Sequence, residues 1–227
     1  MFRYPYIMIN GHIVMQVDDR FLLLDTGAPT SLGEDSVSIG DRSYTVEDNY
    51  LGITADYLTR EIGSRIDGLI GADVIADFTM TIDPLRKEIV FGCSAVDFPV
   101  SIPVDNFMGI PIMDVSVNGS HIRAFFDTGA HLSYINPEFF DGIAPAGQME
   151  DFYPGVGRFT TDTFKLETLI GGEELNLLTY TCIFYNGATY CCEIYPWRIS
   201  VKYNSTQNKT DYTYILSDCY RTEMLKG

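Results

Sequence analysis

Hydrophobic and polar residues alternate along residues 13–17, and an unbroken apolar run follows at residues 21–24. Alternation with a period of two is typical of a strand that buries one face. A continuous apolar run of this length is typical of a strand that is buried on both faces. The two stretches therefore predict a pair of strands joined by a turn at residues 18–20.

The same plan recurs further along the chain. Residues 113–117 alternate, Asn118-Gly119 is a strong hairpin signal, and residues 122–126 form a second apolar run. Matching stretches separated by about one small domain's length indicate an internal repeat. The pattern predicts a mostly β chain with two similar lobes.

Further elements follow from the same reasoning. We expect a hairpin at residues 39–44, a short helix at 54–62 that ends at Gly63, a strand with a helical turn at 68–75, a hairpin from 79–83 to 89–91, and a glycine-rich hairpin tip at 153–159 with a returning strand at 164–170. Few helices are expected, and those few are short.

Each apolar run of the repeat ends in Asp-Thr-Gly-Ala, with the carboxylates at Asp25 and Asp127. A carboxylate on a tight turn after a buried strand is held rigidly, and two such turns can face each other across the seam between lobes. Two close carboxyl groups cannot comfortably both ionise, so they share a proton and can act together as acid and base. A single Asp-x-Gly is more often an ordinary turn, but two copies with matched flanks favour the paired site.

Six neighbours suit a supporting role. The glycines permit the tight turn, the threonine hydroxyls can hydrogen-bond across the seam, and the serines can donate to the outer carboxylate oxygens. These residues are Thr26, Gly27 and Ser31 in the first copy and Thr128, Gly129 and Ser133 in the second.

The motif apolar-apolar-Asp-Thr-Gly-Ala-x-x-Ser resembles the active-site signature of the aspartic proteases, the retropepsin and pepsin superfamily. Residues 68–73 are similar to the family's second motif, and residues 81–91 are similar to its closing hairpin. The resemblance covers residues 10–177. It implies a mostly β, bilobal, aspartic-protease-like (acid protease) double β-barrel with two similar lobes and few short helices.

The resemblance also implies a division of the chain and a set of roles. The N-terminal lobe would span residues 1–97, the connection 98–109, and the C-terminal lobe 110–177. Asp25 and Asp127 would be the catalytic dyad, and the two threonines would grip each other across the seam. Residues 155–157 resemble the tip of the flap that covers bound peptide, and the implied substrate-binding residues are Tyr153, Gly155, Val156, Gly157 and Phe159.

Two departures from the family pattern matter. The first lobe leaves room only for a short flap, for which residues 49–52 are the candidate. The second lobe shows no apolar-apolar-Gly motif at the expected distance after its flap. Residues 169–172 match the motif in sequence but lie too close to the flap. Residues 178–227, rich in Tyr and Cys, stand where that motif is expected. This atypical tail fits an appended segment, a degenerate end of the second lobe or a shifted reading frame.

The expected function is that of an aspartic endopeptidase, which hydrolyses peptide bonds with a water activated between two aspartates. The alternative is a catalytically impaired module that binds peptides or a protein partner. We expect a polypeptide substrate of about six to eight extended residues. Pockets near Leu51, Ile53, Val156 and Phe159 are expected to be apolar. No cofactor or metal is needed, and a monomer suffices because one chain supplies both aspartates.

Other function classes are disfavoured. A net charge of −16 opposes binding to nucleic acid or anionic membranes. No stretch reaches the length of about 20 apolar residues that a membrane helix needs, and no signal-peptide core is evident, so a cytoplasmic location is expected. The five cysteines match no metal signature. His12, His121 and His131 are scattered in the sequence, which disfavours a histidine-based site.

Overall fold

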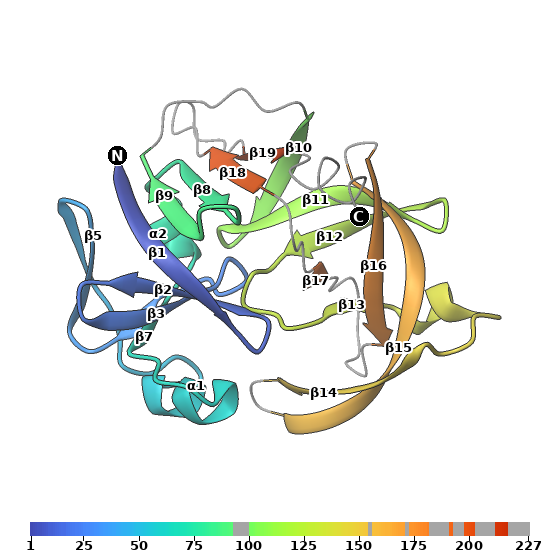
Figure 1. Ribbon diagram of the computed structural model, residues 1–227, viewed down its shortest axis with the longest axis horizontal. Coiled ribbons are helices and arrows are strands. Elements are labelled where there is room, and N and C mark those ends of the chain that lie inside the picture. Colours follow the sequence, from blue (N-terminus) through green and yellow to red (C-terminus); the bar gives the residue numbers. More distant parts are fainter. Residues whose placement is uncertain are drawn as a thin grey trace.

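A computed structural model describes residues 1–92, 100–153 and 156–170, together with the backbone of four later strands. Strands dominate this part of the chain and helices are few and short, which confirms the mostly β prediction (Figure 1). We call residues 1–92 the first half and residues 100–170 the second half. The later strands are β16 (Glu173–Thr181), β17 (Cys191–Cys192), β18 (Arg198–Lys202) and β19 (Tyr212–Ser217).

The first half begins with an antiparallel run of strands, as the alternation predicts. Strand β1 (Phe2–Ile9) pairs with β2 (His12–Val17), and β2 pairs with β3 (Arg20–Leu24). Strand β3 lies parallel to β7 (Gly68–Ile70), which is also antiparallel to the short β4 (Leu32–Gly33). A separate hairpin is formed by β5 (Ser36–Ile39) and β6 (Arg42–Thr45). A buried strand therefore leads directly into the first Asp-Thr-Gly turn.

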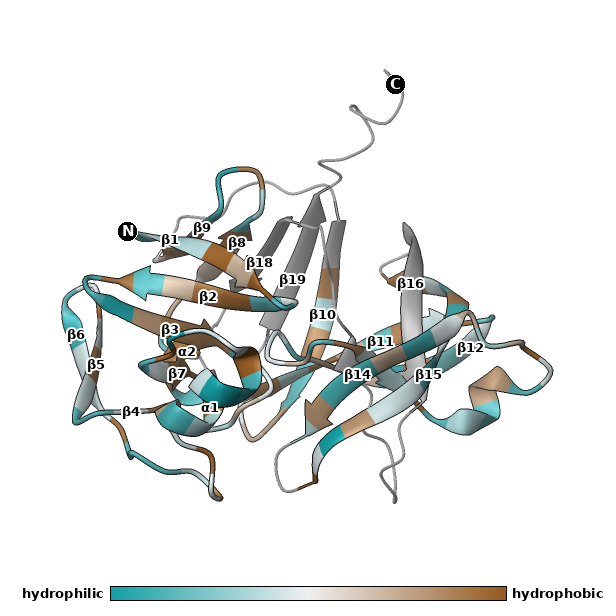
Figure 2. Ribbon diagram, turned by 60° about the horizontal axis from the view of Figure 1, so that its bottom comes forward, coloured by the Kyte–Doolittle hydropathy of each residue, from teal (hydrophilic) through white to brown (hydrophobic). Residues whose placement is uncertain are grey.

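The predicted helices are present. Helix α1 (Ala55–Ile62) begins after Thr54, whose hydroxyl accepts a hydrogen bond from the Tyr57 N–H, and it ends at Gly63 with a φ of 76°. Most of the helix is hydrophilic (Figure 2), and its buried residues are Leu58 and Ile62. Helix α2 (Ala72–Ile75) follows β7, and the hairpin of β8 (Met80–Asp83) and β9 (Glu88–Phe91) closes the half.

The second half repeats much of this arrangement. Its strands are β10 (Val100–Phe107), β11 (Ile110–Val117), β12 (Ser120–Phe126), β13 (Ser133–Ile135), β14 (Gly147–Tyr153) and β15 (Gly157–Ile170), with a 3₁₀ turn at Pro137–Phe140. Strand β10 takes up most of the predicted connection at 98–109 and is antiparallel to β11. Residues 98 and 99 lie outside the described part.

The tail strands join the sheet that runs between the halves. Neighbouring strands in the order β9, β8, β18, β19, β10 and β11 are all antiparallel. Strand β17 is parallel to β12 and antiparallel to β13, just as β7 is parallel to β3 and antiparallel to β4. These tail strands are therefore paired with the strands of both halves. The rest of the tail lies outside the described residues.

The buried core is shared between the halves. Its main cluster includes the fully buried Met15, Leu22 and Phe91 of the first half and Phe126 of the second. Burying a side chain of this size contributes about 1.5–3 kcal/mol, so the shared cluster holds the halves together. A smaller cluster packs α1 onto the sheet through Leu58 and Ile62.

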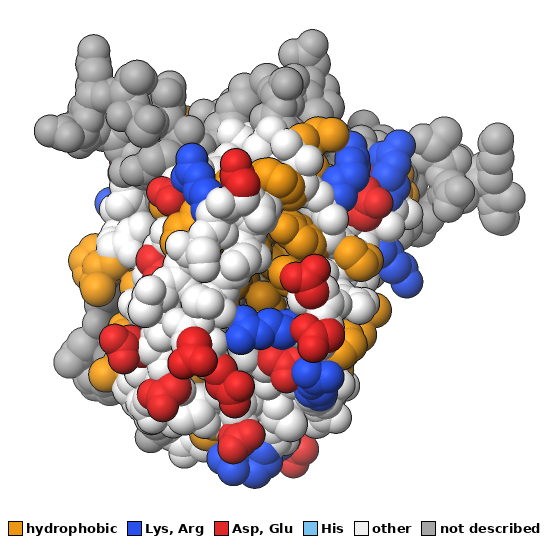
Figure 3. All heavy atoms as spheres, turned by 90° about the vertical axis from the view of Figure 1, so that its left-hand side faces the viewer, with side chains coloured by type: hydrophobic (Ala, Val, Ile, Leu, Met, Phe, Trp, Pro, Cys, Tyr) orange, Lys and Arg blue, Asp and Glu red, His pale blue; other side chains and the backbone are white. Residues whose placement is uncertain are grey.

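The surface reflects the acidic composition. Figure 3 shows Asp and Glu side chains spread over the outer face of the first half, with fewer Lys and Arg between them. Within the described residues, no helix is long and apolar enough to cross a membrane.

Candidate active site

The two Asp-Thr-Gly turns meet at the centre of the molecule and are locked by reciprocal hydrogen bonds. The Thr26 N–H donates to Thr128 Oγ1 (3.1 Å), and the Thr128 N–H donates to Thr26 Oγ1 (3.0 Å). Each hydroxyl then donates across the seam, from Thr26 to the Phe126 carbonyl (2.7 Å) and from Thr128 to the Leu24 carbonyl (2.8 Å). The four bonds fix the two turns relative to each other, as the sequence predicts for the threonines.

Each carboxylate is held by its own turn. Asp25 Oδ1 accepts from the N–H groups of Gly27 and Ala28, both at 2.9 Å. Asp127 Oδ1 accepts from Gly129 at 2.8 Å and from Ala130 at 3.2 Å. The matching contacts give the two side chains the same orientation in their turns.

The glycines bring the carboxyl groups close together. A Cβ atom at Gly27 would lie 2.2 Å from Asp127 Cγ, and one at Gly129 would lie 2.2 Å from Asp25 Cγ. Any larger residue would occupy the place of the opposite carboxyl group. The motif therefore needs glycine for close approach across the seam.

The electrostatics of the pair favour one shared proton. Burial is the largest cause that raises the pKa of Asp25 well above its usual range. The charge of Asp127 and a side-chain hydrogen bond with Asp127 raise it further, whereas the N–H groups of Gly27 and Ala28 act in the opposite direction. Asp25 therefore keeps its proton at a pH where an ordinary aspartate has lost it.

The first turn is supported from behind by residues of the second motif. Ser31 Oγ donates to Asp73 Oδ1 (2.6 Å) and accepts from the Gly71 N–H (2.8 Å). The Asp25 N–H also donates to the Ile70 carbonyl (2.9 Å). The hydroxyl proton of Ser31 is thus directed to Asp73, which corrects the expectation that Ser31 donates to Asp25. Ser133, the counterpart in the second half, is buried.

A cavity of about 530 Å³ lies over the aspartates. Both aspartates line it, together with Tyr50 and Leu51 of the loop at 49–52 that we expected to act as the first-half flap, and with the adjacent Ile53. Apolar walls at Leu51 and Ile53 agree with the prediction of apolar pockets. The cavity is therefore built from both halves around the carboxylate pair.

The predicted flap is the β14–β15 hairpin, and its residues have different places. Tyr153 lines the cavity, whereas Val156, Gly157 and Phe159 are not among its lining residues. Val156 is exposed in the turn, Gly157 has a φ of 91°, and the Phe159 ring lies 6.3 Å from that of Tyr134. Gly155 lies outside the described residues. Only part of the predicted substrate-binding set thus faces the cavity.

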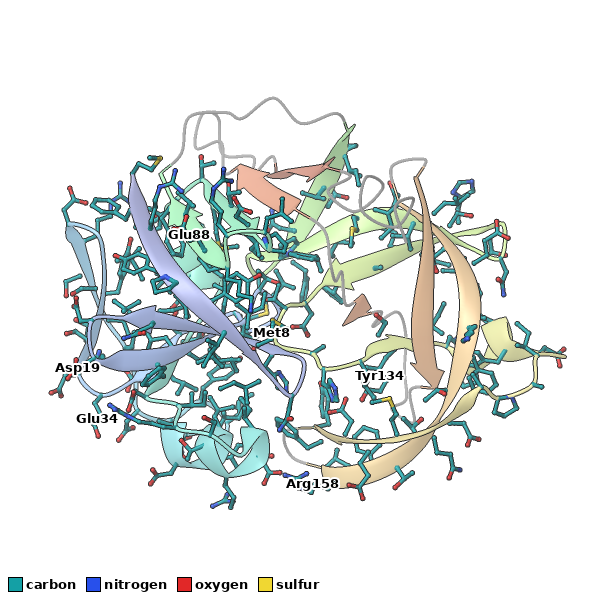
Figure 4. The ribbon with its side chains drawn as sticks, viewed as in Figure 1. Met8, Asp19, Glu34, Glu88, Tyr134 and Arg158 are labelled. Atoms are coloured by element: carbon teal, nitrogen blue, oxygen red, sulfur yellow. The ribbon has the colours of Figure 1, made fainter. Side chains whose placement is uncertain are left out.

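The hairpin contacts the opposite half directly. Arg158 donates to the Glu61 carbonyl (3.0 Å), and its Nε lies 3.1 Å from Glu61 Oε2 at the end of α1. Figure 4 shows Arg158 on the edge of the hairpin nearest to α1. This contact joins the hairpin to the first half.

The cavity also has a polar wall that the sequence did not predict. It is formed by His12 of β2, His131 and Tyr134 near the second turn, and Asp151 and Phe152 of β14. The rings of His12 and His131 lie 5.8 Å apart, and Tyr134 donates a short hydrogen bond to Asp151. Figure 4 places Tyr134 on the second-half side. The prediction that the histidines are scattered is therefore wrong for His12 and His131, which meet although they are far apart in sequence.

No group of three or more side chains that could hold a metal ion occurs among the residues that the structure describes. Searches with protein-family models and against curated proteins found no match to this chain. The geometry of the two turns and the cavity therefore carries the functional argument.

Proposed function

We propose that this chain is an aspartic endopeptidase in which Asp25 and Asp127 activate one water between them. The observation that carries the proposal is the pair of interlocked Asp-Thr-Gly turns, whose carboxyl groups pack against each other's glycines inside a cavity. The repeated strand arrangement supports a bilobal, aspartic-protease-like double β-barrel, with the tail strands completing the second lobe.

The chemistry follows from the shared proton. The ionised carboxylate of the pair takes a proton from the water as the water oxygen bonds to the scissile carbonyl carbon. Asp25, which holds its proton, donates a hydrogen bond to the carbonyl oxygen and so stabilises the developing charge. A proton passes to the nitrogen as the C–N bond breaks, and the pair is left with one proton, as at the start. No metal or covalent intermediate takes part in this scheme.

The cavity suits a polypeptide in an extended conformation. Its walls come from the first-half loop at Leu51 and Ile53 and from the second-half hairpin at Tyr153. Apolar side chains at these walls favour apolar substrate residues next to the scissile bond. Since one chain supplies both aspartates, the site requires no second copy.

The direct test is cleavage of an unfolded protein between mildly acidic and neutral pH, compared with the variants Asp25→Asn and Asp127→Asn. We expect each variant to lose about 10³-fold or more of the activity, since each removes one partner of the acid–base pair. Asp105→Asn is a matched control, because Asp105 forms an exposed ion pair with Arg123. Cleavage that survives in either dyad variant would exclude the proposed mechanism.

A second candidate is a peptide-binding module without activity, and one observation favours it. In the first half, Leu24 pairs with Ile70 and Gly71 follows; in the second, Phe126 pairs with Cys192, and the next residue in the sequence is Glu193. A Cβ at Gly71 would lie 2.8 Å from the Ala28 carbonyl oxygen, so the first half depends on glycine there. The matching place in the sequence of the second half therefore holds a glutamate instead of a glycine. Peptide binding without any cleavage at any pH would favour this candidate.

A further inference from the structure

Leu51 is the most exposed large hydrophobic residue in the described part of the chain, at 84%. It nevertheless lines the cavity over Asp25 and Asp127, at the tip of the short first-half loop. Removal of an apolar side chain of this size from water is favourable. Leu51 therefore lies where a molecule bound in the cavity can cover it.

The backbone of this loop disfavours a leucine. Leu51 has a φ of 52° and Gly52 a φ of 88°, and the residues on either side, Tyr50 and Ile53, form an antiparallel bridge. Positive φ at both central residues of a two-residue loop defines a type I′ turn, whose first position favours asparagine or aspartate. In this left-handed conformation the Cβ atom of a leucine lies too close to the following carbonyl oxygen. The turn is therefore strained at Leu51.

Two other turns of the chain carry the residue that this geometry favours. Asn10-Gly11 joins β1 to β2, and Asn118-Gly119 joins β11 to β12, with φ values of 47° and 49° at the asparagines and of 83° and 79° at the glycines. An asparagine at position 51 would suit the turn and would expose less apolar surface to water. The local fold therefore does not account for the leucine. Strained residues of this kind cluster where ligands bind.

The loop that carries Leu51 is held at both ends. The Tyr50 N–H donates to the Ile53 carbonyl (3.0 Å), and the Ile53 N–H donates to the Tyr50 carbonyl (2.9 Å). The Gly52 N–H donates to Asn49 Oδ1 (2.9 Å). The side chains of Tyr50 and Ile53 pack against the smaller buried cluster beside α1. Little ordering of the loop is therefore needed when a ligand covers Leu51.

We infer that Leu51 is a specificity-determining residue that binds one large apolar side chain of the polypeptide substrate. This inference rests on the proposed function and deepens it, because it assigns one position of the substrate to one residue at the edge of the cavity. Tyr153 lines the same cavity from the second half and is 48% exposed, so both halves offer an apolar surface to a chain that lies between them. The leucine serves binding, although it destabilises the turn.

The test replaces Leu51 by the residue that the turn favours. We expect Leu51→Asn to raise the urea concentration at the unfolding midpoint, because the strain in the turn is reduced. Peptide binding is measured by calorimetry on Asp25→Asn chains with and without this change. The peptides carry a single Leu at successive positions on both sides of the scissile bond, with Asn as its polar partner of similar shape. At one position we expect the Leu peptide to bind roughly tenfold more tightly than the Asn peptide, and this preference to fall to roughly twofold or less in the Leu51→Asn chain.

Met108 provides a matched control. It has a φ of 54°, precedes Gly109 with a φ of 85°, is 63% exposed and is not among the residues that line the cavity. Met108→Asn should therefore raise the unfolding midpoint as Leu51→Asn does, but it should leave the peptide affinities unchanged. Leu51→Met keeps a large apolar side chain in the same turn, so this variant should retain the preference for the Leu peptide.

The outcomes separate this inference from the proposed function, because cleavage is measured on the chain that keeps Asp25. An undiminished preference for the Leu peptide in the Leu51→Asn chain, or a lowered unfolding midpoint, would overturn the role of Leu51 and leave the peptidase standing. A preference that depends on Leu51, without cleavage by the unchanged chain, would support the role of Leu51 and overturn the peptidase. Absence of both binding and cleavage would overturn both proposals.

Discussion

Arg158 of β15 and Glu61 of α1 form an ion pair that joins the two halves beside the cavity, with Arg158 Nε 3.1 Å from Glu61 Oε2. A second bond runs from Arg158 to the Glu61 carbonyl. Because the β14–β15 hairpin carries Asp151, Phe152 and Tyr153 into the cavity wall, this contact holds that wall against the first half.

We expect Arg158→Ala to raise KM for peptides more than it lowers kcat. Once its tether is gone, the hairpin has to order itself on binding. An ion pair whose arginine is exposed contributes up to about 1 kcal/mol, which corresponds to a roughly two- to fivefold change in KM. The difference from the unchanged chain should shrink as salt is added. Arg42→Ala, which removes an exposed ion pair with Asp77 within the first half, serves as the control. A KM that is unchanged at low salt would contradict the tether.

The threonine contacts predict strong coupling between the turns. Thr26→Val keeps the shape of the side chain but removes the hydroxyl that donates to the Phe126 carbonyl and accepts from the Thr128 N–H. Because Thr26 is buried, we expect a loss of about 1–3 kcal/mol in the free energy of unfolding. Thr26→Ser retains the hydroxyl and should cost less.

A double-mutant cycle with Thr128→Val measures the same relationship. The two side chains share hydrogen bonds, so the combined loss should differ from the sum of the single losses by about 0.5 kcal/mol or more. Urea unfolding of the four chains provides the values. If the losses in the free energy of unfolding were strictly additive, the two threonines would not be coupled, and other contacts would hold the two turns together.

Local signals in the sequence predicted much of the fold. Helix α1 lies where Thr54 and Gly63 mark its ends, because capping is decided by neighbouring residues. The hairpin at Asn118-Gly119 follows from the left-handed backbone of its turn, with a φ of 49° at Asn118. The meeting of Asp25 and Asp127 was predictable because the repeat gives both carboxylates the same local setting.

Contacts between distant residues of unlike sequence were not predictable in this way. Ser31 donates a hydrogen bond to Asp73, and the ring of His12 lies near that of His131. Both contacts depend on the course of the backbone in three dimensions, which no local sequence pattern indicates. Strand β17 lies next to β12, as β7 lies next to β3, although Cys191-Cys192 does not match the apolar-apolar-Gly motif. Strand pairing of this kind depends on the backbone, so the letters alone could not reveal it.

Gly71 provides a test of how the first turn is built. A methyl group at this position would lie 2.8 Å from the Ala28 carbonyl oxygen and 2.9 Å from the Thr30 carbonyl carbon, both of them backbone atoms that cannot rotate away. We expect Gly71→Ala to lower the free energy of unfolding by about 1–3 kcal/mol and to reduce activity by displacing the loop behind Asp25. Gly52→Ala is not a clean comparison, because Gly52 has a φ of 88°. Gly147→Ala is better suited, because its nearest neighbour would be the Thr163 hydroxyl at 3.6 Å.

The raised pKa of Asp25 predicts that the carboxylate pair destabilises the fold at neutral pH. The folded pKa lies above the unfolded value near 3.8, so the folded chain binds this proton more tightly. The contribution of the group to the free energy of unfolding is fully present below the unfolded pKa and is lost as the pH rises through the folded pKa. Asp25→Asn removes this loss, because an amide does not ionise.

We therefore expect the Asp25→Asn chain to be more stable than the unchanged chain at pH 7, with a difference that shrinks toward pH 3, when both are followed by urea unfolding across that range. The pH dependence of the cleavage rate should follow the titration of the carboxylate pair. The rate should fall at low pH, where the pair takes up its second proton, and again at high pH, where Asp25 loses its own. The fall in rate at high pH should occur above the pH range in which an ordinary aspartate ionises. If the unchanged chain gains stability relative to Asp25→Asn as the pH rises, the assignment of the retained proton to Asp25 is wrong.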